Sequence, residues 1–300
     1  MEGHNVAVLL AAYNGMAWID EQIESILLQE RVNVHLFISV DISSDDTYNH
    51  CLILAEKYKN VQVLPYGMKF GGAARNFYRL INDVDLTEFD YVSFADQDDI
   101  WKVNKLSRAI EVLTEGHYDC FSSNVTAFWK DGRRVLIKKS QKQVEYDFFF
   151  ESGGPGCTHV LTSSVANNLK AFIQDRRDRV DQIALHDWLI YAYARANGYK
   201  WVIDSWPGML YRQHDSNQFG ANGGFEAIVR RLKMIRNKWY LTEIRRIAKV
   251  LDKERLPFLV KCLDRGYIGH IYMALNINKV RRKPLDRVTL ALLLILGLMK

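Results

Sequence analysis

The stretch "YVSFADQDDIW", residues 91–101, joins an apolar run to a cluster of acids. Tyr91–Ala95 has the composition of a buried strand, and three carboxylates follow it at Asp96, Asp98 and Asp99. Like charges this close repel each other unless something offsets the repulsion. Because residues i and i+2 of extended backbone point to the same side, we expect the carboxylates of Asp96 and Asp98 to face one another.

Two interpretations of this acidic cluster follow from the spacing alone. Oxygen-only ligands suit Mg²⁺ or Mn²⁺, and such an ion is usually completed by substrate phosphates and water. A solvated acidic loop that caps the next helix explains the spacing about as well. In that second role, Asp99 is expected to cap a helix that begins near Lys102.

Strands alternate with helices in the first 118 residues. Apolar runs predict strands, and apolar residues at helical spacing predict the segments between them. This alternation predicts an α/β domain with a parallel, doubly wound sheet and helices on both faces. The predicted strands are Val6–Ala12, Val34–Val40, Val61–Leu64 and Tyr91–Ala95, and one predicted helix is Ala73–Ile81.

Polar side chains stand where these strands end. Tyr13, Asp41 and Asp96 each follow an apolar run. Ligands of open α/β sheets bind outside the carboxyl ends of the strands, so this edge is the expected site. The first turn lacks the GxGxxG spacing of a dinucleotide fold, and no GxxxxGK[ST] phosphate loop occurs. A nicotinamide oxidoreductase and a P-loop NTPase are therefore disfavoured.

Beyond residue 118 the pattern loosens. Strand-like pieces lie near Asp119–Phe128 and Arg134–Ile137, and residues 201–212 have an extended pattern. The Gly/Pro cluster "GGPGC", residues 153–157, allows a close approach of backbone to a ligand. Helices are predicted over Ser164–Phe172 and from near Asp187.

Composition limits the class of protein. The 300 residues are 48% hydrophobic and 25% charged, with a net charge of +5, which is ordinary for a globular chain. The four cysteines are far apart, so free thiols in a reducing cytosol are expected. The N-terminus lacks the basic region of a signal peptide, and the C-terminal apolar run Val288–Met299 is too short to span a bilayer.

Seven motifs together resemble family 2 glycosyltransferases of the GT-A fold. In chain order they are "VAVLLAAYNG", "VDISSDDT", "FGGAARNF", "FADQDDIW", "PGCT", "HDW" and "YRQHDSN". The chain is most similar to bacterial rhamnosyltransferase-like members that build surface polysaccharides. The resemblance covers residues 4–220, and "ADQDDIW" combined with "HDW" is its most specific part. It implies a GT-A-type doubly wound mixed sheet flanked by helices, with a helical C-terminal extension.

The resemblance also implies a role for each matching residue. Tyr13 corresponds to the aromatic that packs on the nucleotide base, and Asp41 to the carboxylate that accepts a hydrogen bond from N3–H of uracil or thymine. Asp98 corresponds to a metal ligand and Asp96 to a ligand of ribose or metal, as in a DxD motif. The remaining matches are Asp187 as the catalytic base, Arg75 and Arg212 facing phosphate, and His214 on metal or diphosphate.

The implied reaction is metal-dependent, inverting transfer of a sugar, plausibly rhamnose from dTDP-rhamnose, to a glycan or lipid-linked acceptor. A UDP-sugar-dependent galactosyl- or N-acetylhexosaminyltransferase and a catalytically silent sugar-nucleotide-binding scaffold are the alternatives. Many family members carry two adjacent acids where this chain has Val40 and Asp41, so support for the base site is less complete here. The resemblance implies a catalytic domain over residues 1–223, in which 1–118 form the nucleotide-binding half and 119–223 the acceptor half. Residues 224–300 then form a helical, basic C-terminal region.

Residues 225–255 carry ten Lys/Arg against four acids. Ile228, Leu232, Ile235 and Trp239 recur at helical spacing, which suits a helix packed on the catalytic domain with a solvated basic face. It also suits a surface helix that meets anionic lipid. We expect a cytoplasmic protein with peripheral membrane contact through this region; nucleic-acid binding is disfavoured because no base-reading motif accompanies the charge.

Overall fold

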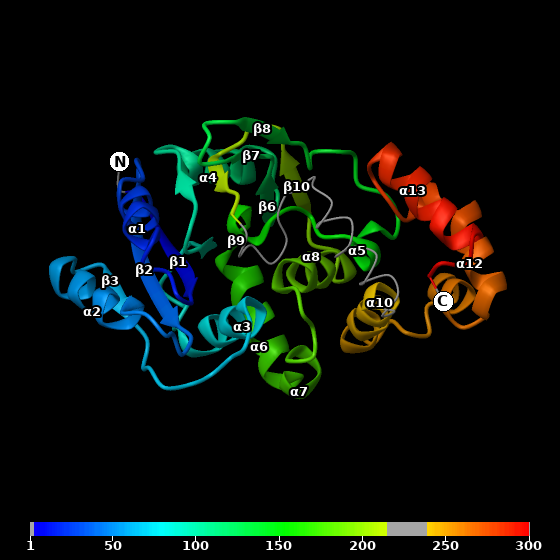
Figure 1. Ribbon diagram of the computed structural model, residues 1–300, viewed down its shortest axis with the longest axis horizontal. Helices are drawn as coiled ribbons and strands as arrows, with labels where there is room; N and C mark the ends of the chain where they lie inside the picture. The colour runs from blue at the N-terminus through cyan, green and yellow to red at the C-terminus, as the bar shows by residue number, and fades with distance from the viewer. Residues whose placement is uncertain (1–2, 215–238, 300) are drawn as a thin grey trace.

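A mixed sheet forms the centre of the computed structural model, which describes residues 3–214 and 239–299 (Figure 1). Seven strands of these described residues form it, in the order β10 (Trp201–Asp204), β6 (Cys120–Ser123), β9 (Val160–Thr162), β4 (Tyr91–Asp96), β1 (His4–Ala12), β2 (Val32–Val40) and β3 (Val61–Val63). The pairs β4–β1, β1–β2 and β2–β3 are parallel, as predicted, whereas β9 runs antiparallel to both of its neighbours.

Helices cover both faces of the sheet, which confirms the doubly wound arrangement. Strand β1 is buried on both sides, so Val6, Val8 and Leu10 face one core and Ala7 and Leu9 the other. The first core is closed by α1 (Ile19–Leu27), α2 (Thr47–Lys57) and α4 (Lys105–Glu115). The second is closed by α3 (Ala73–Asp83), α6 (Ser163–Asp175) and α8 (His186–Ala196).

A smaller second sheet, which the sequence pattern did not reveal, lies beyond the end of β4. Its strands are β5 (Ile100–Trp101), β11 (Met209–Arg212), β7 (Val125–Phe128) and β8 (Arg134–Ile137), in that order. The extended stretch 201–212 is divided between the two sheets, since β10 pairs with β6 and β11 with β5 and β7. The antiparallel β11–β5 pair carries the chain after residue 209 back to the acidic loop that follows β4.

The C-terminal region is helical, as expected. Its described helices are α10 (Trp239–Val250), α11 (Pro257–Leu263), α12 (Gly266–Leu275), the 3₁₀ turn η2 (Ile277–Lys279) and α13 (Pro284–Ile295). Ile244, Leu259 and Met273 belong to the same buried cluster as Phe77 of α3, so this region packs on the catalytic core. The domain boundary at residue 223 and the helix predicted from Ile228 lie outside the described residues, except for Trp239, at which α10 begins.

Candidate active site

Asp41 lies directly after β2 and organises the loop that precedes α3. Its carboxylate accepts backbone N–H bonds from Ile42 at 2.8 Å, Phe70 at 2.9 Å and Gly71 at 2.9 Å. Gly71 has φ +70°, which favours glycine at this position. A carboxylate has about four acceptor sites, so Asp41 retains capacity for one further donor such as a base N–H.

Tyr13 follows β1 and is held by Gln97 of the acidic loop. The Tyr13 N–H donates to Gln97 Oε1 at 2.7 Å, and Gln97 Nε2 donates to the Tyr13 carbonyl at 2.8 Å. The Tyr13 side chain is 55% exposed, as an aromatic that stacks on a ligand requires. An added Cβ at Gly15 would lie 2.5 Å from Gln97 Oε1, so glycine is needed beside this clamp. Sequence reasoning missed Gln97.

Asp96 ends β4 at the centre of the sheet edge. Burial is the largest cause that raises its pKa, to about 7, and the nearby charges of Asp98 and Asp187 raise it further. Asp187 therefore lies close to the acidic loop, although the two are about ninety positions apart in the sequence. The structure thus brings the predicted base to the predicted metal-binding carboxylates.

Asp98 pairs with His214, the other end-of-strand residue to which the resemblance assigns a metal-binding role. Asp98 Oδ2 lies 2.7 Å from His214 Nε2, and the His214 ring stacks on Trp18 with centroids 4.2 Å apart. Trp18 precedes α1, so three distant segments of the chain meet at this point. The aromatic stack orients the imidazole toward the acidic loop.

Arg212, at the end of β11, fixes the same loop. Its Nε donates to the Asp98 carbonyl at 2.7 Å, and its guanidinium also pairs with Glu21 of α1. Its backbone N–H donates to Asp99 Oδ1 at 3.0 Å. The expectation that Asp99 caps the following helix is wrong: α4 begins at Lys105, and Asp99 is fully buried beneath the loop.

A buried polar cluster supports the acidic loop from below. Burial and the charges of Asp98 and Asp96 raise the pKa of Asp99 well above its usual range. The Cys157 Sγ lies within 4.8 Å of a carboxylate oxygen of Asp99, and burial raises the pKa of this thiol too, so it stays protonated. Lys105, another residue that sequence reasoning missed, lies here with its Nζ 3.4 Å from the Trp101 ring centroid. Burial lowers the pKa of Lys105 to about 7.

Asp187 lies in the first turn of α8. Burial raises its pKa to about 6, and the Trp188 N–H at 2.8 Å, the Ser152 side chain and the charge of Lys139 oppose that rise. The preceding His186 is buried, stacks on Phe77 and has a pKa lowered to about 3 by burial, so it is neutral. A carboxylate with a pKa near 6 suits proton abstraction at neutral pH.

Comparison with known proteins agrees with this geometry. The sequence profile described as "Glycosyltransferase like family 2" matches residues 4–168. This chain belongs to glycosyltransferase family 2. It is 45% identical to the dTDP-rhamnosyl transferase RfbG of Shigella flexneri over 290 residues, which are 96% of this chain and 100% of the relative. It is 25% identical to the Escherichia coli UDP-Glc:alpha-D-GlcNAc-diphosphoundecaprenol beta-1,3-glucosyltransferase WfgD, over 56% of this chain and 64% of that one.

Solved structures confirm the GT-A fold. Residues 1–349 of Staphylococcus aureus TarS, solved with UDP-GlcNAc, superpose with a TM-score of 0.54 at 16% identity, covering 100% of this chain and 89% of TarS. The mannosyltransferase PcManGT of Pyrobaculum calidifontis, solved with GDP-Man and Mn²⁺, gives 0.53 at 14% identity, covering 98% and 81%. The expected enzyme class and fold are therefore confirmed, and the chain is a family 2 glycosyltransferase.

Arg75, which the resemblance places against the diphosphate of the nucleotide sugar, has its observed contact away from the acidic loop of this glycosyltransferase. It stands in the first turn of α3, is exposed, and donates from Nε to the Asp181 carbonyl at 3.0 Å. Asp181 directly follows α7 (Arg177–Val180) and precedes the segment that leads to Asp187. Its predicted contact with the diphosphate stays a prediction.

Side chains near the end of β4 of this glycosyltransferase have the chemistry of ligands for a divalent cation. Asp96, Asp99 and Cys157 each offer one ligand atom, and these atoms lie within 4.8 Å of one another. A buried protonated thiol does not suit Mg²⁺ or Mn²⁺, and Asp99 already accepts the Arg212 N–H. Asp96, Asp98 and His214 carry the oxygen and imidazole ligand types that Mn²⁺ accepts, and of these Asp98 Oδ2 and His214 Nε2 lie 2.7 Å apart.

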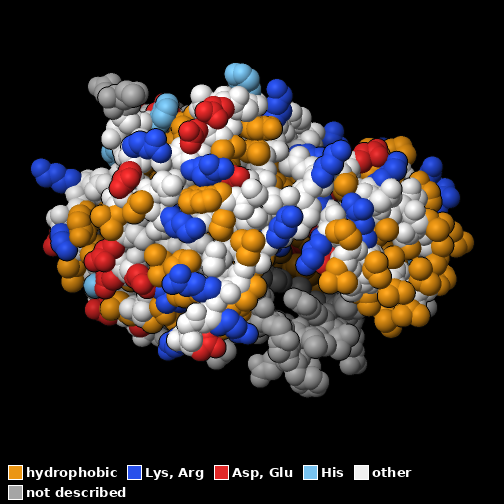
Figure 2. Space-filling view, turned by 90° about the horizontal axis from the view of Figure 1, so that it is seen from above, with side chains coloured by type: hydrophobic (Ala, Val, Ile, Leu, Met, Phe, Trp, Pro, Cys, Tyr) orange, Lys and Arg blue, Asp and Glu red, His pale blue; other side chains and the backbone are white. Residues whose placement is uncertain are grey.

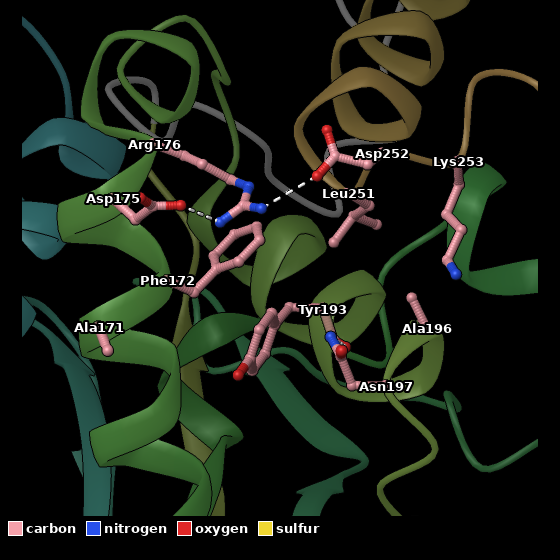
Figure 3. Close-up of a pocket in the computed structure, with 10 residues that line it drawn as sticks. All are labelled: Ala171, Phe172, Asp175, Arg176, Tyr193, Ala196, Asn197, Leu251, Asp252 and Lys253. Atoms are coloured by element: carbon pink, nitrogen blue, oxygen red, sulfur yellow. Dashed lines mark hydrogen bonds and ion pairs between the residues drawn. The ribbon is translucent and has the colours of Figure 1, made fainter.

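A cavity of about 470 Å³ lies elsewhere, where α6 and α8 meet the end of α10 (Figure 3). The aromatic rings of Phe172 and Tyr193 line it, and Arg176 crosses its rim to pair with Asp252 at 3.0 Å. None of the predicted site residues lines this cavity. The cavity lies at the interface between the glycosyltransferase core and its C-terminal region.

Among residues 3–214 and 239–299, none of the helices combines the length and the apolar composition that a membrane span requires.

Proposed function

We propose that this enzyme transfers rhamnose from dTDP-rhamnose to a glycan or lipid-linked acceptor, with inversion and with a divalent cation. The observation that carries the proposal is the position of the Asp187 carboxylate. It lies close enough to Asp96, at the end of β4, for its charge to raise the pKa of Asp96, and burial raises its own pKa to about 6. The choice of rhamnose rests on the 45% identity to a dTDP-rhamnosyl transferase along nearly the whole chain.

In this reaction Asp187 removes the proton from an acceptor hydroxyl as its oxygen attacks the anomeric carbon. The bond from that carbon to the diphosphate oxygen breaks on the opposite face, so one displacement inverts the centre and dTDP leaves with the bonding electrons. Asp96, Asp98 and His214 would hold Mg²⁺ or Mn²⁺, which when bound offsets the negative charge of the leaving diphosphate. Tyr13 would stack on the thymine and Asp41 would accept its N3–H.

A donor panel tests this proposal. The protein is incubated with Mn²⁺ and with dTDP-rhamnose, UDP-galactose, UDP-N-acetylglucosamine or a GDP-sugar, and nucleotide release is measured with and without candidate acceptors. We expect acceptor-dependent release of dTDP, lost when EDTA removes the cation. Turnover with a UDP-sugar alone would overturn the choice of donor, and silence with every donor would favour the scaffold alternative.

We propose further that α12 and α13 rest on the cytoplasmic face of an anionic membrane. Figure 2 shows hydrophobic side chains gathered at the end of the molecule that these helices form. The exposed apolar residues there are Tyr267, Ile268, Leu275, Leu285, Val288, Leu292, Ile295, Leu296 and Leu298. Exposed Arg265 and Lys283 stand directly before α12 and α13, and exposed Lys261 lies in the preceding α11, which suits an interface with anionic headgroups.

Vesicle flotation tests this membrane contact. We expect the protein to float with vesicles that contain phosphatidylglycerol and to float less with pure phosphatidylcholine. Leu292→Glu should abolish flotation, whereas Leu136→Glu, at a leucine of similar exposure on β8, should not. Unchanged flotation of Leu292→Glu would contradict the proposal. The proposal would also fail if the native protein does not float and is a dimer, while Leu292→Glu is a monomer, because the apolar face would then bind a second copy of the chain.

A further inference from the structure

One buried arginine joins the C-terminal region to a segment that lies beside the proposed catalytic base. Arg282 stands between η2 and α13, and its side chain is only 1% exposed. A buried guanidinium is costly unless charged and polar groups surround it. The Arg282 Nε lies 3.4 Å from Glu151 Oε1 and 3.6 Å from Asp147 Oδ2. These carboxylates lie within residues 119–223, the predicted acceptor half, so the arginine joins two regions of the chain.

Arg282 also fixes the backbone at the start of segment 151–157. Its guanidinium donates to the Ser152 carbonyl, and its own N–H donates to Glu151 Oε1 at 2.7 Å. The neighbouring Asp147 is itself held, by Arg195 at 3.1 Å and by the Tyr191 hydroxyl at 2.8 Å. Arg282 is thus anchored on a rigid base and can hold the segment in one place.

The rest of segment 151–157 lies against the reacting groups. The Ser152 hydroxyl donates to the Gly154 carbonyl at 2.8 Å, which fixes the turn of the segment. The Ser152 side chain also lies close enough to Asp187 to lower the pKa of that carboxyl. A Cβ added at Gly156 would lie 2.3 Å from Nε2 of His186, so the backbone is packed tightly against the start of α8. The Cys157 Sγ lies within 4.8 Å of a carboxylate oxygen of Asp96. The segment therefore lies beside both the proposed base and the carboxylate that ends β4.

A second contact of the C-terminal region braces the same two elements. The Tyr240 hydroxyl of α10 donates to the Phe150 carbonyl at 2.7 Å, just before the segment begins. Glu243 of α10, fully buried, accepts the Ala184 N–H at 2.6 Å, just before α8 begins. The C-terminal helices thus hold the segment and the base-bearing helix from one side.

From these contacts we infer that Arg282 is a positioning residue for sugar transfer: it holds segment 151–157 so that Ser152 orients the Asp187 carboxylate. This inference rests on the proposed role of Asp187. It gives the C-terminal region a part in the reaction besides membrane contact. The donor-binding residues Tyr13 and Asp41 lie in the other half, so losing Arg282 should leave donor binding intact.

The test compares Arg282→Ala with the native protein in three measurements. Hydrogen exchange followed by mass spectrometry should show faster exchange in peptides that cover 151–158. Calorimetry with dTDP-rhamnose and Mn²⁺ should still show one donor site per chain with a similar dissociation constant. The transfer rate per donor-binding site should fall at least tenfold. Arg245→Ala is the matched control, because Arg245 pairs with Asp264 and the Leu263 carbonyl within the C-terminal region, away from the segment.

A double-mutant cycle separates positioning from a general loss of structure. If Arg282 acts through Ser152, then Arg282→Ala should cost little further activity in a Ser152→Ala background. Additive losses would overturn the inference, and so would an unchanged transfer rate per site in Arg282→Ala. If Arg282→Ala does not fold, Arg282→Lys, which keeps the charge but not the fork of donors, carries the same comparisons.

The exchange measurement also separates this inference from the proposed donor. Unchanged exchange at 151–158 would overturn the role of Arg282 whatever sugar the enzyme uses. If the native protein turns over no dTDP-rhamnose, the proposed donor fails instead, and the transfer comparison is made with whichever donor the panel identifies.

Discussion

The Asp98 carboxylate and the His214 imidazole meet at 2.7 Å across 116 positions of sequence. Asp98 belongs to the loop after β4, and His214 follows β11 of the second sheet. The β11–β5 pairing brings these two segments together. The pair places an oxygen and a nitrogen ligand side by side at the sheet edge where the donor is proposed to bind.

Asp98→Ala should weaken metal-dependent donor binding by at least about 10-fold, since even groups that only support a metal ligand typically contribute 10- to 100-fold. Calorimetry with dTDP-rhamnose in Mn²⁺ and in EDTA measures the effect, which should be confined to the Mn²⁺ condition. Asp131→Ala, in the exposed turn between β7 and β8, is the control and should bind normally. Equal weakening of binding in EDTA would mean that Asp98 contacts the donor directly or supports the fold.

Gln97→Ala should raise the donor KM several-fold while leaving kcat nearly unchanged. The substitution removes both hydrogen bonds that fix the Tyr13 backbone, each worth roughly 1 kcal/mol. The exposed Tyr13 ring would then be less well placed to stack on the base. Steady-state kinetics with varied donor separates the two constants, and a fall in kcat at constant KM would contradict the role given to Gln97.

The pH profile of kcat should have an acid limb near pH 6. Burial holds the pKa of Asp187 at about 6, above its usual value of 3.8, and only the ionised form accepts a proton. The rate should therefore fall tenfold per pH unit below that point. Ser152→Ala removes a hydrogen bond that lowers this pKa, so its limb should move to higher pH. An acid limb near pH 4 in both proteins would show that another group limits the rate.

Asp187→Asn should make the protein more stable at pH 7.5, by up to about 3 kcal/mol, because burial raises the pKa of Asp187 from 3.8 to about 6. A carboxyl whose folded pKa is raised opposes folding when ionised, so removing its charge helps above pH 6. As the pH falls toward 4 the native Asp187 takes up its proton, and the difference should vanish. Urea unfolding at both pH values measures this, and a gain that persists at pH 4 would point to packing instead.

The sequence predicted well those features that depend on local pattern. Apolar runs mark β1, β2 and β4, and because parallel strands end at one edge, Tyr13, Asp41 and Asp96 were expected together. The motif resemblance, not spacing, supplied Asp187 and His214, since nothing local says that distant segments converge. His214 reaches the acidic loop through the antiparallel β11–β5 pair, and β5, with two residues, is too short to show as a pattern. Asp187 reaches it from the start of α8.

Contacts between unlike, distant residues could not be predicted. Gln97 looks like any loop glutamine, yet it clamps a backbone 84 positions away. Arg282 looks like part of a solvated basic run, yet it is buried against a segment 130 positions upstream. Asp99 was wrongly expected to be a cap because acidic residues near helix starts usually are; burial beneath the loop decided otherwise.

The central claim is that Asp187 is the base of a sugar transfer. Single-turnover transfer from dTDP-rhamnose, with Mn²⁺ and acceptor at pH 7.5, measures it most directly in the native protein and in Asp187→Asn. The account predicts donor binding of native affinity in the variant and a transfer rate lower by about 10²–10⁴-fold. Transfer by Asp187→Asn at the native rate would contradict it.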